Sequence, residues 1–488
     1  SFHLSPYFMK YISFVLLLLV IHLHLPAQDD LSQLSYETID SFIILGYQQH
    51  DLNKTILYSK AGRDKAEAQY GTLDTIFAEY SGNLGFFYTS LGQYKKAEAF
   101  LLEAKNIVLQ VQGKEHPAYA TNISNLGNVY QKMAQFENSE KFYLEALQNR
   151  AETIGKEHPQ YAVSLNRIGN LYQEMELYEK AEAVYLESKK IRAKVYGENH
   201  PKYATVLNNL ATVYHSMQML ERAEPLLLLS LSIKSEIYGE MHPTNARIMN
   251  NLAGLYRDMK RYVEAEKLHL KAAEIEATFY GKTHPDYLTS LVNLASLYKK
   301  MGKNKKAESL FLKSKEIYAK TLGEESSNYS IILNNLAVLY NDIGEPEKAE
   351  LLYLQANEIR AKAVGKEHLL YATSLNNLAS LYLSIGKLDT ALNYILQSID
   401  ANSADIDSTF LRVDPTEWTK LAQANYYSNH AMSNSMQLFL IIIKRRYEKT
   451  KDPKILDQHY ELAKTTMALN ERIRNNLNGE KDKLRLLK

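Results

Sequence analysis

A repeat of 42 residues runs through most of the chain and constrains its fold more than any other feature. A glycine and a tyrosine each recur at this spacing, and a His-Pro pair begins five consecutive units. The glycines are Gly71, Gly113, Gly155, Gly197, Gly239, Gly281, Gly323 and Gly365, and the tyrosines are Tyr88, Tyr130, Tyr172, Tyr214, Tyr256, Tyr298, Tyr340 and Tyr382. A fixed period of this length is typical of an array of stacked structural units.

Each unit has the pattern of two helices. Leu207, Leu210 and Tyr214 are spaced as one face of a helix, and Ala349 and Tyr353 repeat the pattern in the second half of a unit. Proline suits the first helical turn, and glycine suits the left-handed cap after a helix. Four turns between the two helices must form without glycine, at Ala134, Glu176, Gln218 and Lys260. Since one helix pair cannot bury its apolar face alone, we expect the units to be stable only when stacked.

These patterns resemble a known family. The Leu-small-x-x-Tyr of the first helix and the Ala-x-x-x-aromatic-x-x-small of the second are similar to the tetratricopeptide repeat. The 42-residue length, the leading His-Pro and the Leu-Asn-Asn-Leu-Ala at residues 207–211 resemble the long repeats of kinesin light chains, over about Asp74–Ala404. The resemblance implies an all-α, right-handed superhelical solenoid that binds a protein or an extended peptide segment in its concave groove.

The loss of the repeat at both ends divides the chain into four predicted parts. We expect a signal peptide at residues 1–27, a degenerate N-terminal helical cap at 28–72, eight repeats at 73–404 and a C-terminal helical extension at 405–488. The signal peptide is indicated by Met9-Lys10, the apolar run Ile12–Leu25 and a cleavage site after Ala27. The protein is therefore expected to be exported from a bacterial cell, to the periplasm or beyond. The alternative is a membrane anchor formed by the same segment without cleavage.

Composition and motifs argue against several classes of function. The formal net charge is +1, which predicts no nucleic-acid partner and no binding to a membrane surface. The chain has no cysteine, which excludes disulfides, thiolate metal sites and a thiol nucleophile. We find no phosphate-binding loop, zinc-protease motif or nucleophile elbow, so we expect neither an enzyme nor a cofactor. The repeated histidines cannot share a metal, because neighbouring helices lie roughly 8–10 Å apart and zinc ligands lie at about 2 Å.

A row of amides is the candidate binding site. One residue before the core leucine of the first helix, seven repeats have asparagine and one has arginine. We call these residues the amide row: Asn83, Asn125, Arg167, Asn209, Asn251, Asn293, Asn335 and Asn377. The resemblance to kinesin light chains implies that they contact a peptide backbone, for which an amide suits because it both donates and accepts hydrogen bonds. The alternative is that the row bonds neighbouring repeats to each other and binds nothing.

The C-terminal tail carries a second resemblance. Its ERIRNNL…EKDKLRLL pattern is similar to the connector that precedes the caspase-like CHAT peptidase domain in bacterial proteins. This resemblance implies an alternative function, in which the chain is the sensor or regulatory arm of a CHAT-type protease whose catalytic domain is not in this sequence. The alternative interpretation is that the basic residues of the tail form a solvated helix face without a specific function.

Overall fold

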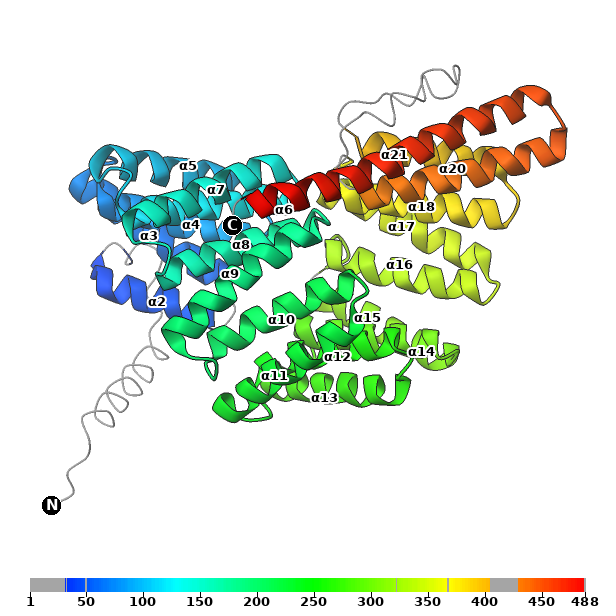
Figure 1. Cartoon of the computed structure of the whole chain (residues 1–488). Coiled ribbons are helices and arrows are strands. Elements are labelled where there is room, and N and C mark those ends of the chain that lie inside the picture. Colours follow the sequence, from blue (N-terminus) through cyan, green and yellow to red (C-terminus); the bar gives the residue numbers. More distant parts are fainter. Residues whose placement is uncertain are drawn as a thin grey trace. The chain divides into compact units, whose positions relative to one another are not determined.

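The computed structural model describes residues 31, 33–48, 51–321, 323–366, 368–403 and 429–486, which form helices and no β-strand (Figure 1). The expected signal peptide at residues 1–27 lies outside this part of the chain, as does the segment 404–428 with Trp418. The chain forms two compact units, Ser1–Lys132 and Met133–Lys488, which are described separately. The predicted all-α tetratricopeptide-like solenoid is confirmed.

Unit 1 contains five helices within the described residues, and successive helices contact each other. They are α2 (Tyr36–Gln48), α3 (Leu52–Tyr70), α4 (Thr75–Ser90), α5 (Tyr94–Val111) and α6 (Pro117–Lys132). In α3, the Tyr80 ring packs so closely on Gly62 that a Cβ would lie 2.4 Å from its Cε1 atom. Later repeats have alanine or serine at the corresponding position, and this contact explains why a glycine occupies it in α3. That α2 and α3 act as a cap stays a prediction.

Unit 2 contains the remaining helices, of which α7 to α19 alternate between two kinds. The first helix of each repeat, called helix A, is α8 (Pro159–Glu174), α10 (Pro201–Ser216), α12 (Pro243–Asp258), α14 (Pro285–Lys300), α16 (Ser327–Asp342) and α18 (Leu369–Ser384). The second helix, called helix B, is α7 (Phe136–Thr153), α9 (Tyr178–Tyr196), α11 (Leu220–Tyr238), α13 (Tyr262–Tyr280), α15 (Asn304–Thr321), α17 (Pro346–Ala363) and α19 (Leu388–Ala401). In unit 1, α4 and α6 are of kind A and α5 is of kind B. Each helix A begins 42 residues after the one before, as the repeat predicts.

The repeated histidines cap the A helices. In α10, the Nδ1 atom of His200 accepts a hydrogen bond from the backbone N–H of Lys202 at 3.1 Å, and the same cap begins α8, α12, α14 and α18. Asp74 and Ser326 cap α4 and α16, which begin the units without a histidine at this position. The four turns without glycine adopt the left-handed conformation, with φ from 56° at Ala134 to 62° at Lys260.

Small residues of helix A let large residues of helix B enter the core. At Gly169, an added Cβ would lie 2.6 Å from the ring of Tyr185, which is completely buried. In the next repeat the pair is Ala211 and the smaller Leu227, both buried. Close packing therefore matches the two volumes within each repeat. This arrangement fixes the distance between helix A and helix B of the same repeat.

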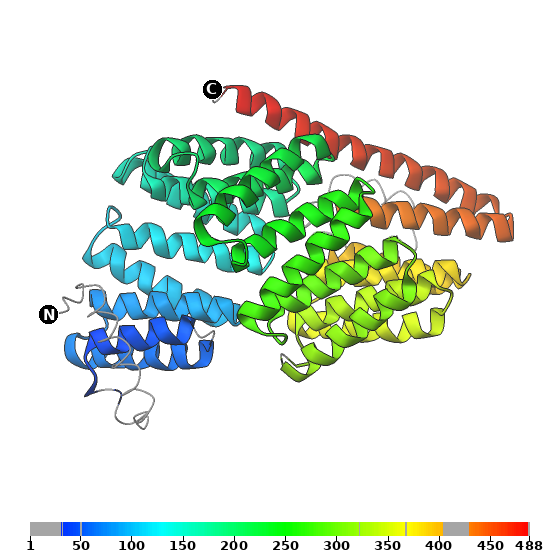
Figure 2. The same ribbon diagram turned by 90° about the horizontal axis from the view of Figure 1, so that it is seen from below.

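The chain ends in two further helices, α20 (Asn429–Thr450) and α21 (Pro453–Leu486), which lie side by side (Figures 1 and 2). Helix α20 packs against α18 and α19, where Phe439, Ile442 and Ile443 join the core. Half of the apolar stretch Leu438–Ile443 is therefore buried, which stabilises the packing of α20, whereas Ile441 is 44% exposed. No helix within the described ranges has the length and apolarity needed to cross a membrane. The side chains that carry the CHAT resemblance beyond Arg472 lie outside the described part.

Candidate peptide-binding row

The amide row follows the line along which A helices of successive repeats contact each other. In unit 2 these contacts join α8 to α10, α10 to α12, α12 to α14 and α14 to α16. The row members are half-buried in both units: Asn83, Asn125, Arg167, Asn209, Asn251, Asn293, Asn335 and Asn377. Half-burial leaves one side of each amide to the protein and the other to solvent or to a ligand.

Three members of the row bond to the preceding repeat. The Nδ2 atoms of Asn209, Asn251 and Asn377 donate to Oδ1 atoms of asparagines 43 residues earlier. These acceptors are Asn166 at 3.1 Å, Asn208 at 2.9 Å and Asn334 at 2.7 Å. Bonding between neighbouring repeats, the alternative left open by the sequence, therefore occurs at these positions. Contact with a peptide stays a prediction.

Within unit 2, two other members of the row, Asn293 and Asn335, have no side-chain hydrogen bond among the described residues. The residue 43 positions before Asn335 is Val292, which has no side-chain acceptor. The residue 43 positions before Asn293 is Asn250, whose Oδ1 bonds to Nδ1 of His269 at 2.8 Å. The amides of Asn293 and Asn335, in two adjacent repeats, therefore lack the acceptor from the preceding repeat that other members of the row use. Their amides are the best placed in the row to meet another chain.

The remaining members are at the N-terminal side of the row. Asn83 and Asn125 are half-buried in α4 and α6 of unit 1, and Arg167 is half-buried in α8 of unit 2. Near Arg167 lies Arg150, which is buried and donates to Oγ of Ser164 at 2.5 Å. Burial and the charge of Arg167 lower the pKa of Arg150 to about 10. Two guanidinium groups therefore lie close together at this end of the row in unit 2.

Polar pairs also bridge consecutive A helices near their C-terminal ends. Nε2 of His215 lies 2.7 Å from Oδ2 of Asp258, and Nζ of Lys299 lies 3.0 Å from Oδ2 of Asp342. Exposed pairs of this kind contribute little to stability. Their effect is to present charged and polar groups beside the amide row.

A tyrosine–glutamate column joins the repeats at the turn between helix A and helix B. The hydroxyl of each recurring tyrosine donates to a glutamate 32 residues earlier, in helix B of the preceding repeat. The pairs are Tyr130–Glu98 in unit 1 and, in unit 2, Tyr172–Glu140, Tyr214–Glu182, Tyr256–Glu224, Tyr298–Glu266, Tyr340–Glu308 and Tyr382–Glu350. The sequence analysis did not identify the recurring tyrosine as the partner of this glutamate. The constant separation of 32 residues was the signal.

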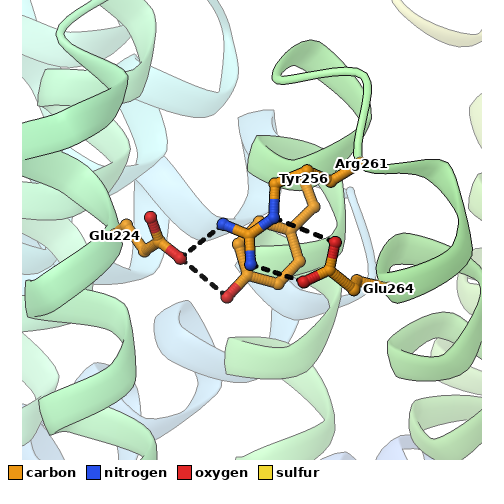
Figure 3. A network of polar contacts seen from close by, with 4 residues as sticks. All are labelled: Glu224, Tyr256, Arg261 and Glu264. Atoms are coloured by element: carbon orange, nitrogen blue, oxygen red, sulfur yellow. Dashed lines mark hydrogen bonds and ion pairs between the residues drawn. The ribbon is translucent and has the colours of Figure 1, made fainter.

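Cations complete the column in several repeats. Arg261 donates to Glu224 at 2.7 Å and lies 3.8 Å above the centre of the Tyr256 ring, while Glu264 binds its other nitrogens (Figure 3). Glu308 has no ion pair among the described residues; the ammonium group of Lys348, which lies 5.1 Å from the centre of the Tyr340 ring, interacts with it only at longer range. Burial, together with the bond to Glu308, raises the pKa of the Tyr340 hydroxyl to about 12.

The histidine caps stack on tyrosines rather than forming a metal centre. The rings of Tyr196 and His200 lie 4.6 Å apart, and those of Tyr280 and His284 lie 4.3 Å apart. Among the described residues, no three histidine, aspartate or glutamate side chains lie close enough to hold a metal ion. The histidines thus pack and cap helices at the turns between repeats.

Comparison with known proteins identifies the repeat. The tetratricopeptide repeat model matches residues 76–150, 119–187, 162–236, 244–320, 290–362 and 330–404, so it covers more than half of the chain. No curated protein sequence matches the chain.

Several solved structures are similar to parts of the chain. BtubC (BKLC) from P. vanneervenii is 29% identical, with a TM-score of 0.40, over 47% of this chain and 91% of that one. A putative kinesin light chain with tetratricopeptide-like repeats from Podosopora anserina is 26% identical, with a TM-score of 0.36, over 42% of this chain and 97% of that one. A Rap protein complexed with competence and sporulation factor is 13% identical, with a TM-score of 0.47, over 83% of this chain and 99% of that one.

Proposed function

Because this chain belongs to the tetratricopeptide repeat family, we propose that it is a non-catalytic scaffold that holds an extended segment of a partner protein along the part of the amide row in unit 2. An extended segment presents a backbone donor or acceptor at every residue. A row of asparagines can meet both kinds of group, since each amide carries two N–H donors and one carbonyl acceptor.

The observation that carries this proposal is the pair Asn293 and Asn335. Both amides are half-buried, and neither has a hydrogen bond within the described residues, in contrast to Asn209, Asn251 and Asn377. An unpaired polar group at a half-buried position loses free energy unless water or a ligand satisfies it. Repeats six and seven are therefore the proposed centre of the contact.

At the N-terminal end of the row in unit 2, Arg167 should favour a bound segment that carries a negative charge. Its guanidinium and that of Arg150 concentrate positive charge, which favours an acidic side chain of the bound segment. The proposed ligand is thus an extended protein segment with a carboxylate near its contact with repeat three. Loss of a hydrogen bond to a charged group costs about 1.5–3 kcal/mol, so Arg167→Ala should weaken binding more than loss of one amide.

A comparative capture tests the proposal. The baits are the wild-type chain, the double variant Asn293→Ala/Asn335→Ala and the control Glu274→Gln, which changes an exposed residue of helix B. Partners retained by the wild type and by the control, but lost from the double variant, support the amide row. Equal retention by all three baits would place the contact elsewhere.

A further inference from the structure

A chain of buried polar groups crosses the junction of the fifth and sixth repeats, where α13 packs between α12 and α14. The hydroxyl of Ser290 donates to Oε2 of Glu276 at 2.5 Å and accepts from Nδ2 of Asn250 at 2.6 Å. Oδ1 of Asn250 lies 2.8 Å from Nδ1 of His269. Glu276, Ser290 and His269 are each at most 5% exposed. At the position of His269, the other repeats of unit 2 have apolar or aromatic side chains, such as Tyr185, Leu227 and Phe311.

The residue type at position 276 is unusual in this array. The equivalent positions in four other repeats are basic: Arg150, Arg192, Lys234 and Arg360. Where these are deeply buried, they donate to neutral oxygens. Arg192 donates to the carbonyl of Lys202 at 2.6 Å, and Arg360 to that of Leu370 at 3.0 Å. A carboxylate cannot donate to such carbonyls, whereas a protonated carboxyl can.

The core of the fifth repeat also differs from that of its neighbours, because an asparagine replaces a tyrosine. Asn245 occupies the position that holds Tyr203 in the fourth repeat and Tyr287 in the sixth. Its Nδ2 donates to the carbonyls of Gly239 and Glu240, but its buried Oδ1 has no hydrogen-bond partner among the described residues. This repeat therefore lacks an aromatic ring that both neighbouring repeats bury in the core.

The charged groups around Glu276 do not neutralise it. Arg247 of α12 favours the ionised form, and Asp286 of α14 opposes it, while Tyr280 of α13 also lies nearby. Lys234 of α11 lies near Arg247, and no ion pair to Glu276 occurs within the described residues. Burial raises the pKa of Glu276 to about 7, despite the Ser290 bond and Arg247.

His269 is not the group that titrates in this range. Asn250 donates through Nδ2 to Ser290, so its Oδ1 must accept, and Nδ1 of His269 must carry the proton. Burial, together with the charge of Arg257, lowers the pKa of His269 to about 4. The imidazole is therefore neutral on both sides of neutral pH. The change in charge falls on Glu276.

We propose that the junction of the fifth and sixth repeats is a proton-controlled joint, which Glu276 holds closed when protonated and loosens when ionised. A carboxyl with a raised pKa in the folded protein stabilises the packed state below its unfolded value of 4.5, and this stabilisation is lost as the pH rises through about 7. Loosening of α13 from α14 lets the parts of unit 2 on either side change their angle. The spacing between Asn251 and Asn293 then changes with pH.

Distance measurements test the joint directly. The chain has no cysteine, so Lys190→Cys in α9 and Glu358→Cys in α17 can carry a pair of spin labels at exposed sites on either side of the junction. We expect the distance distribution to be narrow at pH 6 and to broaden or shift at pH 8.5, with a midpoint near 7. With Glu276→Gln, which is neutral and of the same shape, the narrow distribution should persist at both pH values. The exposed control Glu274→Gln should behave as the wild type does.

Two results would overturn the joint. One is a wild-type distribution that is the same at pH 6 and pH 8.5, which decides the matter even if the Gln variant fails to fold. The other is a pH response that persists in a folded Glu276→Gln variant. Hydrogen exchange, corrected for its intrinsic pH dependence, supplies a second readout: amides of α14 should lose protection at least about tenfold above neutral pH in the wild type only.

Discussion

Removal of a single hydroxyl from the tyrosine–glutamate column should lower the stability of the array. The size of this loss should depend on whether the glutamate keeps an ion pair. Tyr340 donates to Glu308 at 2.7 Å, and Tyr256 donates to Glu224 at 2.9 Å. After Tyr256→Phe, Glu224 keeps its ion pair with Arg261 at 2.7 Å. After Tyr340→Phe, Glu308 keeps no ion pair within the described residues, although it stays half-buried. The two variants remove the same atom from equivalent positions of two repeats.

The magnitudes follow from whether a cation neutralises the acceptor carboxylate, as Arg261 neutralises Glu224. A hydrogen bond to a charged group contributes about 1.5–3 kcal/mol to stability, and a typical hydrogen bond contributes about 0.5–1.5 kcal/mol. We expect Tyr340→Phe to lie in the first range and Tyr256→Phe in the second. Tyr88→Phe is the control, because Ile56 stands where its glutamate would be, and it should change stability by about 0.5 kcal/mol or less.

Local hydrogen exchange, together with denaturant unfolding, measures these differences. Exchange is needed because an array loses stability repeat by repeat, so a single global transition can hide a local change. Protection should fall most at the junction of α15 and α16 in Tyr340→Phe, and less at the junction of α11 and α12 in Tyr256→Phe. Equal losses, or a larger loss in Tyr256→Phe, would refute the view that the arginine compensates for the hydroxyl.

Three further predictions concern the array and its export. Deletion of His200–Met241, one unit in phase, should leave a folded and shorter helical array by circular dichroism, whereas deletion of 20 residues should unfold the neighbouring repeats. We propose that the chain is exported, so its mature N-terminus in a bacterial host should be Gln28, and intact Met9 on soluble cytoplasmic protein would refute this. Burial, with hydrogen bonding to glutamate, raises the pKa of Tyr214, Tyr298 and Tyr340 to about 12. The stability that these hydroxyls confer should therefore be complete below pH 10 and lost between pH 10 and 12, with a smaller loss in Tyr340→Phe.

The repeat period and its turn chemistry allowed the fold to be predicted from the sequence. His-Pro and Gly fix where helices begin and end through local backbone preferences, which act within a few residues. The caps at Asp74 and Ser326 and the glycine-free turn at Lys260 were predictable for the same reason.

The state of the amide row could not be predicted, because it depends on contacts between repeats. Asn209 and Asn293 occupy the same repeat position, but the acceptor 43 residues earlier is available only to Asn209. That difference arises from His269, whose imidazole engages Asn250 in the core. A substitution in one helix thus changes the bonding of an amide in the next repeat. The burial of the Glu276 carboxyl could not be predicted from the sequence either, since three helices form its environment.

The affinity of a captured partner segment for two matched double variants tests the central claim most directly. Asn293→Ala/Asn335→Ala removes the two amides without an inter-repeat bond, whereas Asn209→Ala/Asn251→Ala removes two amides that have one. At about 0.5–1.5 kcal/mol for each hydrogen bond, the first variant should weaken binding by about 1–3 kcal/mol at unchanged stability, and the second should lose stability. Unchanged affinity in the first variant would contradict the account and would mean that the partner segment does not contact these two amides.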